Sequence, residues 1–366
     1  IYNTLLIMTE QKDSEYNSVD REKYKKAQAE RDSHKDLVEK DYIPHFFPTY
    51  RIKGNLYPLP IILVVALAGI LAFMAYVLAG IQVEGGYVSE SEYGPAAGLL
   101  NGLIFTVFAV ISAFIMIFFV KKYGINVLKY IFAISFGFIA FFFTDFYGSI
   151  IIYLIFINFQ ETATVVLIYE VLVVYVLPIV VAGLTFLMIY KYLTTKSYGT
   201  KNFIVLYIGL LIGATMGVIM PLWTTLAILI GISLWDIFAT RSKYGPIKEM
   251  IDIAGASDPE EGEMSQEEIE EKIKSGEMEY DTSKLEIGIG DLAFYSMLTS
   301  SALLQTNSIL VMIFTALAVI IGTGITITGL KRNKLLPGLP ISIFLGIGTM
   351  LLSWFIVSTF SLYLPF

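Results

Sequence analysis

The sequence contains no cysteine, and its only two histidines, His34 and His45, lie in a hydrophilic N-terminal stretch. Disulfides, thiolate metal sites and a cysteine nucleophile are therefore excluded, as is a histidine base or ligand inside an apolar segment. We expect no metal site and no cofactor. A basic patch is also lacking. The sequence has 25 Lys and Arg against 32 Asp and Glu, so the net charge is −7. No nucleic-acid partner is therefore expected.

Charged residues of any kind are scarce, at 16% of 366 residues, whereas 56% are hydrophobic and the mean hydropathy is +0.69. A soluble protein of this length could not bury so much apolar surface. The sequence therefore predicts an all-α, polytopic protein of the lipid bilayer. A span needs about 20 residues of helix, and the apolar segments predict nine transmembrane helices, near 59–81, 96–120, 125–147, 164–190, 202–219, 222–240, 288–304, 308–330 and 338–361. The third is ambiguous, because apolar character continues past Asp145 to Phe159.

Basic residues are missing from every second loop. Beyond Lys53, none occurs in 82–95, 148–163, 220–221, 305–307 or the C-terminal end. The positive-inside rule then predicts a cytoplasmic N-terminus and an outer C-terminus, and we expect the cell membrane as the location. The predicted organisation is a cytoplasmic hydrophilic region at 1–57, helices one to six within 58–240, a cytoplasmic acidic loop with an amphipathic start at 241–287, and helices seven to nine within 288–366.

Two acids stand at matching depth on consecutive antiparallel helices. Asp236 lies little more than one turn before the cytoplasmic end of the sixth predicted helix, and Asp291 about one turn into the seventh. Two adjacent carboxyl groups cannot both ionise in a low dielectric, so they would share one proton. Such a pair can activate a water and protonate a carbonyl oxygen, which is aspartic-protease chemistry. Gly288 and Gly290 would let backbone approach closely and let an extended peptide enter.

Other interpretations stay open on these residues alone. An acid one turn from a helix end is often an interface residue, and Asp236 can pair with Arg241 or Lys243. Paired membrane acids also serve proton-coupled transporters and cation channels. A catalytically silent scaffold or membrane chaperone is a third possibility. Cleavage by the purified protein, lost on mutation of the pair, would separate the three.

Three motifs give the chain a specific resemblance. Trp235-Asp236 lies in the sixth predicted helix, Gly288-Ile289-Gly290-Asp291 opens the seventh, and Pro337-Gly338-Leu339-Pro340 opens the ninth. The chain resembles the presenilin family of intramembrane aspartic proteases, which includes the signal peptide peptidases. That family carries Tyr-Asp, Gly-x-Gly-Asp and Pro-Ala-Leu motifs in the same order and spacing. The resemblance runs from about the second predicted helix to the C-terminus.

The resemblance implies a presenilin-like fold of nine helices and an aspartic endopeptidase that cuts transmembrane helices of other proteins. Accessory subunits or an oligomer are possible partners, and the loop at 241–287 corresponds to one that presenilins cut themselves. Because the basic loops give the presenilin orientation, the expected substrates have their N-terminus outside. The implied residues are catalytic Asp236 and Asp291, and substrate-binding Gly288, Gly290, Pro337, Gly338, Leu339 and Pro340.

Three residues depart from the family pattern. Trp235 replaces the usual Tyr, and Gly338 replaces the Ala of the third motif, which would loosen the start of that helix. Glu286 stands where presenilins often have Lys, and we expect it to add negative charge near the two acids. None of these changes removes a catalytic carboxyl group, so they bear on substrate preference more than on activity.

Overall fold

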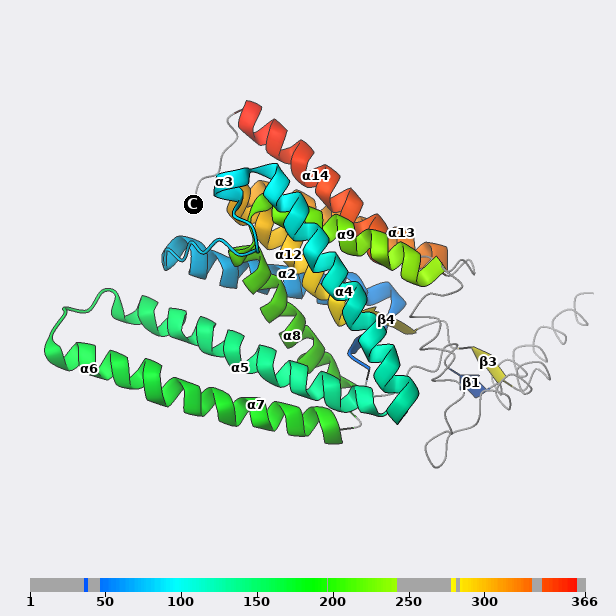
Figure 1. Ribbon diagram of the computed structural model, residues 1–366, viewed down its shortest axis with the longest axis horizontal. Coiled ribbons are helices and arrows are strands. Elements are labelled where there is room, and N and C mark those ends of the chain that lie inside the picture. The colour runs from blue at the N-terminus through cyan, green and yellow to red at the C-terminus, as the bar shows by residue number, and fades with distance from the viewer. Residues whose placement is uncertain are drawn as a thin grey trace, which may run out of the picture. The chain divides into compact units, whose positions relative to one another are not determined.

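The computed structural model describes residues 36–38, 47–195, 197–241, 278–280, 284–330 and 338–360. These residues belong to two units. In the smaller unit, strand β1 (Asp36–Val38) pairs in parallel with β3 (Met278–Tyr280). The larger unit holds the helices and a second strand pair, in which β2 (Thr49–Lys53) runs antiparallel to β4 (Lys284–Gly288) (Figure 1).

The predicted all-α membrane architecture is confirmed, and all nine predicted segments form helices. The third predicted helix continues to Phe156 and reaches 30 residues, which resolves its ambiguous end. Two segments contain a π-helical turn, at Met74–Leu78 and Leu172–Val176. The α-helices are α2 (Pro58–Phe73), α3 (Glu90–Tyr93), α4 (Pro95–Tyr123), α5 (Val127–Phe156), α6 (Ala163–Val171), α7 (Leu177–Thr194), α8 (Tyr198–Ile219), α9 (Leu222–Arg241), α12 (Ile289–Thr306), α13 (Ile309–Leu330) and α14 (Leu339–Thr359).

Within the described ranges, eight helical segments are long and apolar enough to cross a membrane. The ninth predicted span, α12, is not among them, because Asp291, Gln305 and several Ser and Thr residues dilute its apolar content over only 18 residues. That α12 crosses the bilayer therefore remains a prediction. Its Ser and Thr side chains are sheltered by protein, since all of them are buried.

The outer faces of the other helices are apolar. Ile179 and Phe186 on α7 are 71% and 73% exposed, and Leu99 on α4 is 69% exposed. Soluble proteins rarely leave large contiguous apolar surface uncovered. An integral, multi-pass membrane protein presents such faces to lipid instead, so these exposed side chains agree with the predicted class.

Helix α12 lies at the centre of the larger unit, packed against α2, α8, α9, α13 and α14 (Figure 1). Its contact with α8 is close because α8 turns a stripe of glycines toward it. A methyl group built on Gly213 would lie 2.2 Å from Cβ of Ser296, and one on Gly217 would lie 2.5 Å from Cβ of Ser300. No side chain fits there, so the glycines fix the distance between the two backbones.

The loop between α2 and α4 is held against the start of α9. Asn101 is fully buried on α4, and its carboxamide accepts two main-chain N–H bonds from this loop and donates to Oγ1 of Thr224 at 3.0 Å. The carboxylate of Glu90 accepts hydrogen bonds from the main-chain N–H groups of Trp223 and Thr224. These N–H groups have no hydrogen-bond partner within α9, because they lie in its first turn. Glu90 therefore supplies the acceptor that they lack.

Candidate active site

Asp236 and Asp291 lie at the start of α14, although they come from different helices. Asp236 stands in the last two turns of α9, and its Oδ2 accepts a hydrogen bond from the N–H of Leu339 at 3.2 Å. Asp291 stands in the first turn of α12, where a methyl group built on Gly338 would lie 3.6 Å from its Oδ2. The two carboxyl groups are also close enough to interact electrostatically.

Each carboxyl group has a polar neighbour on its own helix. Thr240 lies one turn beyond Asp236, near enough to act on its carboxyl group. The main-chain N–H of Gly288 is likewise near the carboxyl group of Asp291. Gly288 is the N-cap residue of α12 and Asp291 is the third residue of the helix, which are the two positions that a capping box joins. Both Asp residues are half-buried.

The two glycines before Asp291 are required neither by packing nor by backbone conformation. Gly288 has φ −65° and ψ 146°, which any residue adopts. A methyl group built on Gly288 would meet Oδ2 of Asp291 at 3.7 Å, and one on Gly290 would meet Cε2 of Phe294 at 3.7 Å. Both are ordinary van der Waals distances. In the described ranges, the backbone of another segment therefore does not crowd either glycine.

The third motif forms the beginning of α14. Gly338 is its N-cap residue, and Leu339 and Pro340 are its first two helical residues, both of them buried. Proline is tolerated in a first helical turn because the N–H that it lacks would have no partner there. Pro337 lies outside the described residues. The start of α14 therefore brings Gly338 and Leu339 to the two acids.

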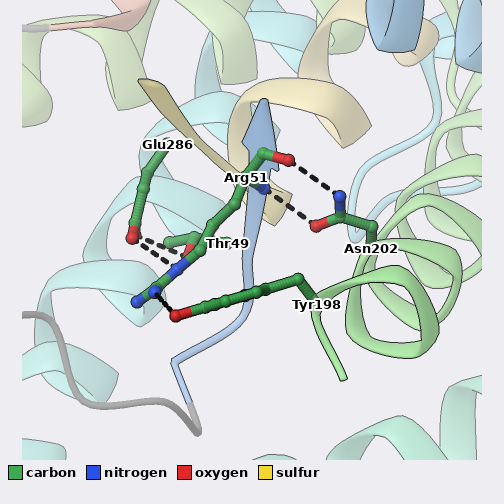
Figure 2. Close-up of polar contacts among 5 residues, drawn as sticks. All are labelled: Thr49, Arg51, Tyr198, Asn202 and Glu286. Atoms are coloured by element: carbon green, nitrogen blue, oxygen red, sulfur yellow. Dashed lines mark hydrogen bonds and ion pairs between the residues drawn. The ribbon is translucent and has the colours of Figure 1, made fainter. Parts of the chain in front are cut away.

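Glu286 does not carry an unpaired charge, which corrects the expectation that it adds negative charge near the two acids. Its Oε1 forms an ion pair with Nε of Arg51 at 2.6 Å, and its Oε2 accepts a hydrogen bond from Oγ1 of Thr49 at 2.7 Å (Figure 2). Arg51 and Thr49 precede the first membrane helix. Sequence reasoning missed them because they are more than 200 positions away from Glu286 and belong to no motif.

Strand β2 completes the approach to Asp291. In the antiparallel register, Thr49 lies opposite Gly288 and Arg51 lies opposite Glu286. One residue further, the N–H of Ile289 donates to the carbonyl oxygen of Pro48 at 3.1 Å. The first N–H group of α12 is thereby satisfied. The second edge of β4 pairs with no strand in the part of the chain that the structure describes.

The fold and the site define a class of protein. It is a polytopic α-helical membrane protein in which a carboxyl group from α9 and one from α12 both lie at the start of α14. No group of His, Cys, Asp or Glu residues in the described ranges could hold a metal ion. Residues 254–361 match the Presenilin family model. The chain is also 36% identical over 134 residues to Presenilin-B of Dictyostelium discoideum. Over these residues the chain is similar to presenilins.

The matched regions are partial. The similarity to Presenilin-B covers 35% of this chain and 25% of that protein, so the chain spans about a quarter of that relative's length. The family match includes Asp291 and the start of α14, whereas Asp236 lies before its first residue. The contact between Asp236 and Leu339 therefore connects the matched part of the chain to the part outside it.

Proposed function

We propose that the protein is an intramembrane aspartic endopeptidase that hydrolyses peptide bonds within transmembrane helices of other membrane proteins. Asp236 and Asp291 are the catalytic residues. The observation that carries the proposal is that both carboxyl groups lie at the start of α14. The N–H of Leu339 donates to Asp236, and Gly338 lies next to the carboxyl group of Asp291. The similarity of residues 254–361 to the Presenilin family model supports the same activity.

The chemistry follows from two carboxyl groups that share a proton. Like charges at close range in a low dielectric disfavour the doubly ionised state, so one carboxyl group is ionised while the other is protonated. The ionised group takes a proton from water as the water oxygen bonds to the scissile carbonyl carbon, and the other group protonates the carbonyl oxygen. The tetrahedral intermediate then loses its C–N bond as a carboxyl group protonates the leaving amine.

A substrate must reach this site in extended form, because the amide groups of a helix are engaged in its own hydrogen bonds. Within the described residues, no other segment's backbone lies against Gly288 or Gly290, the two glycines next to Asp291. The second edge of β4 leads directly to the same place, and an exposed strand edge can accept an extended peptide. We assign substrate contact to Gly288, Gly290, Gly338, Leu339 and Pro340, together with Pro337 by resemblance.

The orientation in the membrane belongs to the same proposal. The N-terminus and the loop at 241–287 are cytoplasmic and the C-terminus is outside, in the cell membrane, because the basic residues gather in alternate loops. Substrates then enter with their N-terminus outside and are cut near the cytoplasmic face. Accessory subunits or further copies of the chain are the proposed partners.

The experiment is cleavage of a single-span substrate by the purified protein in liposomes. We expect wild-type protein to cut the substrate, and Asp236→Asn and Asp291→Asn each to abolish cleavage, because Asn keeps the shape but cannot transfer a proton. A proton-coupled transporter, the alternative use of paired membrane acids, would instead show ion-driven flux without cleavage. Substantial cleavage by either Asn variant would overturn the proposal.

A further inference from the structure

Arg51, the central residue of β2, is held from both sides (Figure 2). Toward β4, its Nε forms the 2.6 Å ion pair with Glu286, and the arginine side chain is only 12% exposed. Toward α8, its guanidinium donates to the hydroxyl of Tyr198 at 3.0 Å and lies 4.8 Å from the centre of that ring. Arg51 thus links the strand pair to the beginning of α8.

The backbone of Arg51 is fixed as firmly as its side chain. Its N–H donates to Oδ1 of Asn202 and its carbonyl oxygen accepts from Nδ2 of Asn202, both at 2.8 Å. The Asn202 carboxamide therefore forms the two hydrogen bonds that a neighbouring strand would form with the N–H and C=O groups of Arg51 at this edge of β2. Since these backbone groups point away from β4, Arg51 and Glu286 form a non-hydrogen-bonded pair, in which opposite side chains lie closest.

The position of β4 determines the position of Asp291, because the strand runs directly into α12. Strand β4 ends at Gly288, which is itself the N-cap residue of α12, so no loop separates the strand from the helix. The hydrogen bond from the N–H of Ile289 to the carbonyl oxygen of Pro48 lies at this junction, two residues before Asp291. A shift of β4 along β2 would therefore move the Asp291 carboxyl group relative to Asp236.

We propose that Arg51 is a positioning residue for Asp291, acting through Glu286 and β4 and anchored on α8 by Asn202 and Tyr198. The segment before the first membrane helix thereby sets the geometry of the site. The effect on catalysis rests on the proposed protease function, whereas the structural link does not. Removing Arg51 breaks this ion pair with the partly buried Glu286, which destabilises this junction in particular.

The test compares three variants of the full chain in detergent. Arg51→Met removes the link. The charge exchange, Arg51→Glu combined with Glu286→Arg, restores an ion pair between the two positions with the acid on β2 and the base on β4. Lys53→Met is the matched control, because it removes the same charge from the same strand at an exposed position. Two quantities are measured for each: amide hydrogen exchange of peptides covering 284–292, and kcat and KM for cleavage of a single-span substrate.

We expect Arg51→Met to speed exchange at the junction and to lower kcat about ten- to a hundredfold with KM little changed, because a small displacement of a catalytic group has costs of this order. The charge exchange should recover part of both quantities, because it restores the ion pair but not the contact of the Arg51 guanidinium with Tyr198, and Lys53→Met should change neither. Unchanged amide exchange in Arg51→Met would overturn the positioning role, as would a loss of activity that the charge exchange does not recover at all. If the wild-type protein cuts nothing, the protease function fails, while the exchange measurement still decides the structural link.

Discussion

The main-chain N–H of Leu339 donates a hydrogen bond to Oδ2 of Asp236 across 103 positions of sequence. This bond comes from the first turn of α14, while the preceding residue, Gly338, borders the carboxyl group of Asp291. The start of α14 therefore touches both acids. A rotation or displacement of this helix would change the position of both carboxyl groups together.

The first prediction isolates the bond from Leu339. Leu339→Pro removes the N–H at the first helical position, where proline is tolerated, whereas Leu339→Ala keeps the N–H and shortens the side chain. We expect Leu339→Pro to have a kcat/KM about tenfold or more below that of Leu339→Ala, because a hydrogen bond to a charged group contributes about 1.5–3 kcal/mol. Equal kcat/KM values in the two variants would show that the bond does not orient Asp236.

The second prediction concerns the contact between α8 and α12. Gly213→Ala places a methyl group 2.2 Å from Cβ of Ser296 and 2.8 Å from the carbonyl oxygen of Ala293, so the two helices must separate. We expect a loss of about 1–3 kcal/mol of stability, as for other overpacked sites, measured as a lower Tm. Cleavage should fall as well, because α12 carries Asp291.

A matched control and a rescue are available for this variant. Gly183→Ala on α7 adds the same methyl group where no atom lies within 4 Å, and it should leave Tm unchanged. Combining Gly213→Ala with Ser296→Gly removes the opposing Cβ and should recover part of the lost Tm. A Tm for Gly213→Ala equal to that of the control would contradict the close packing of α8 on α12.

The third prediction is a pH dependence in the loop between α2 and α4. Desolvation acts to raise the pKa of Glu84, but hydrogen bonds from the main-chain N–H groups of Ser91 and Glu90 and from the hydroxyls of Ser89 and Ser91 outweigh it, so the pKa lies below its ordinary value. A lowered folded-state pKa contributes stability above the unfolded pKa and loses it as the pH falls through the folded value.

The corresponding measurement is Tm against pH for wild type and Glu84→Gln. We expect the wild type to be the more stable at neutral pH, the difference to shrink as the pH falls below the ordinary glutamate value of about 4, and to disappear below the lowered folded-state pKa, where the carboxyl group is protonated in both states. A Tm difference that persists unchanged at low pH would mean that the ionised form of Glu84 does not stabilise the loop.

The fourth prediction concerns orientation. Because the chain has no cysteine, single cysteines can be labelled without background. We expect a cysteine at Gln160, in the exposed turn after α5, to react with an impermeant reagent added outside, and one at Ser197, before α8, to react only after permeabilisation. Labelling in the reverse pattern would give the signal peptide peptidase orientation and reverse the class of substrate.

Much of the helical framework could be predicted because each span is a run of apolar residues and each polar gap ends it. Asp236 and Asp291 could be placed at one depth because consecutive membrane helices are antiparallel and both acids lie near the same end. Helix α5 was harder to delimit, since its apolar character continues beyond one bilayer thickness to Phe156. The polar character of α12 is tolerated because other helices surround it.

The contacts of Arg51 could not be predicted in the same way. Its partners, Glu286 and Asn202, are distant in sequence, and an ion pair or a carboxamide on a strand edge leaves no periodic pattern. Glu90 presents the same difficulty, because an acid in a polar loop gives no sign that it satisfies the start of α9. The glycines of α8 do recur at every fourth position, which predicts close packing of another helix on α8. The spacing alone does not show that this helix is α12.

The most direct test of the central claim is a double-mutant cycle on the two acids. Cleavage of one single-span substrate is measured in liposomes for wild type, Asp236→Asn, Asp291→Asn and the double variant. If the two carboxyl groups act as one unit, each single variant loses cleavage and the double variant is no worse than either, because the second substitution removes a group that no longer functions alone. Residual cleavage in the single variants that falls by the product of their separate effects in the double variant would contradict a shared-proton pair.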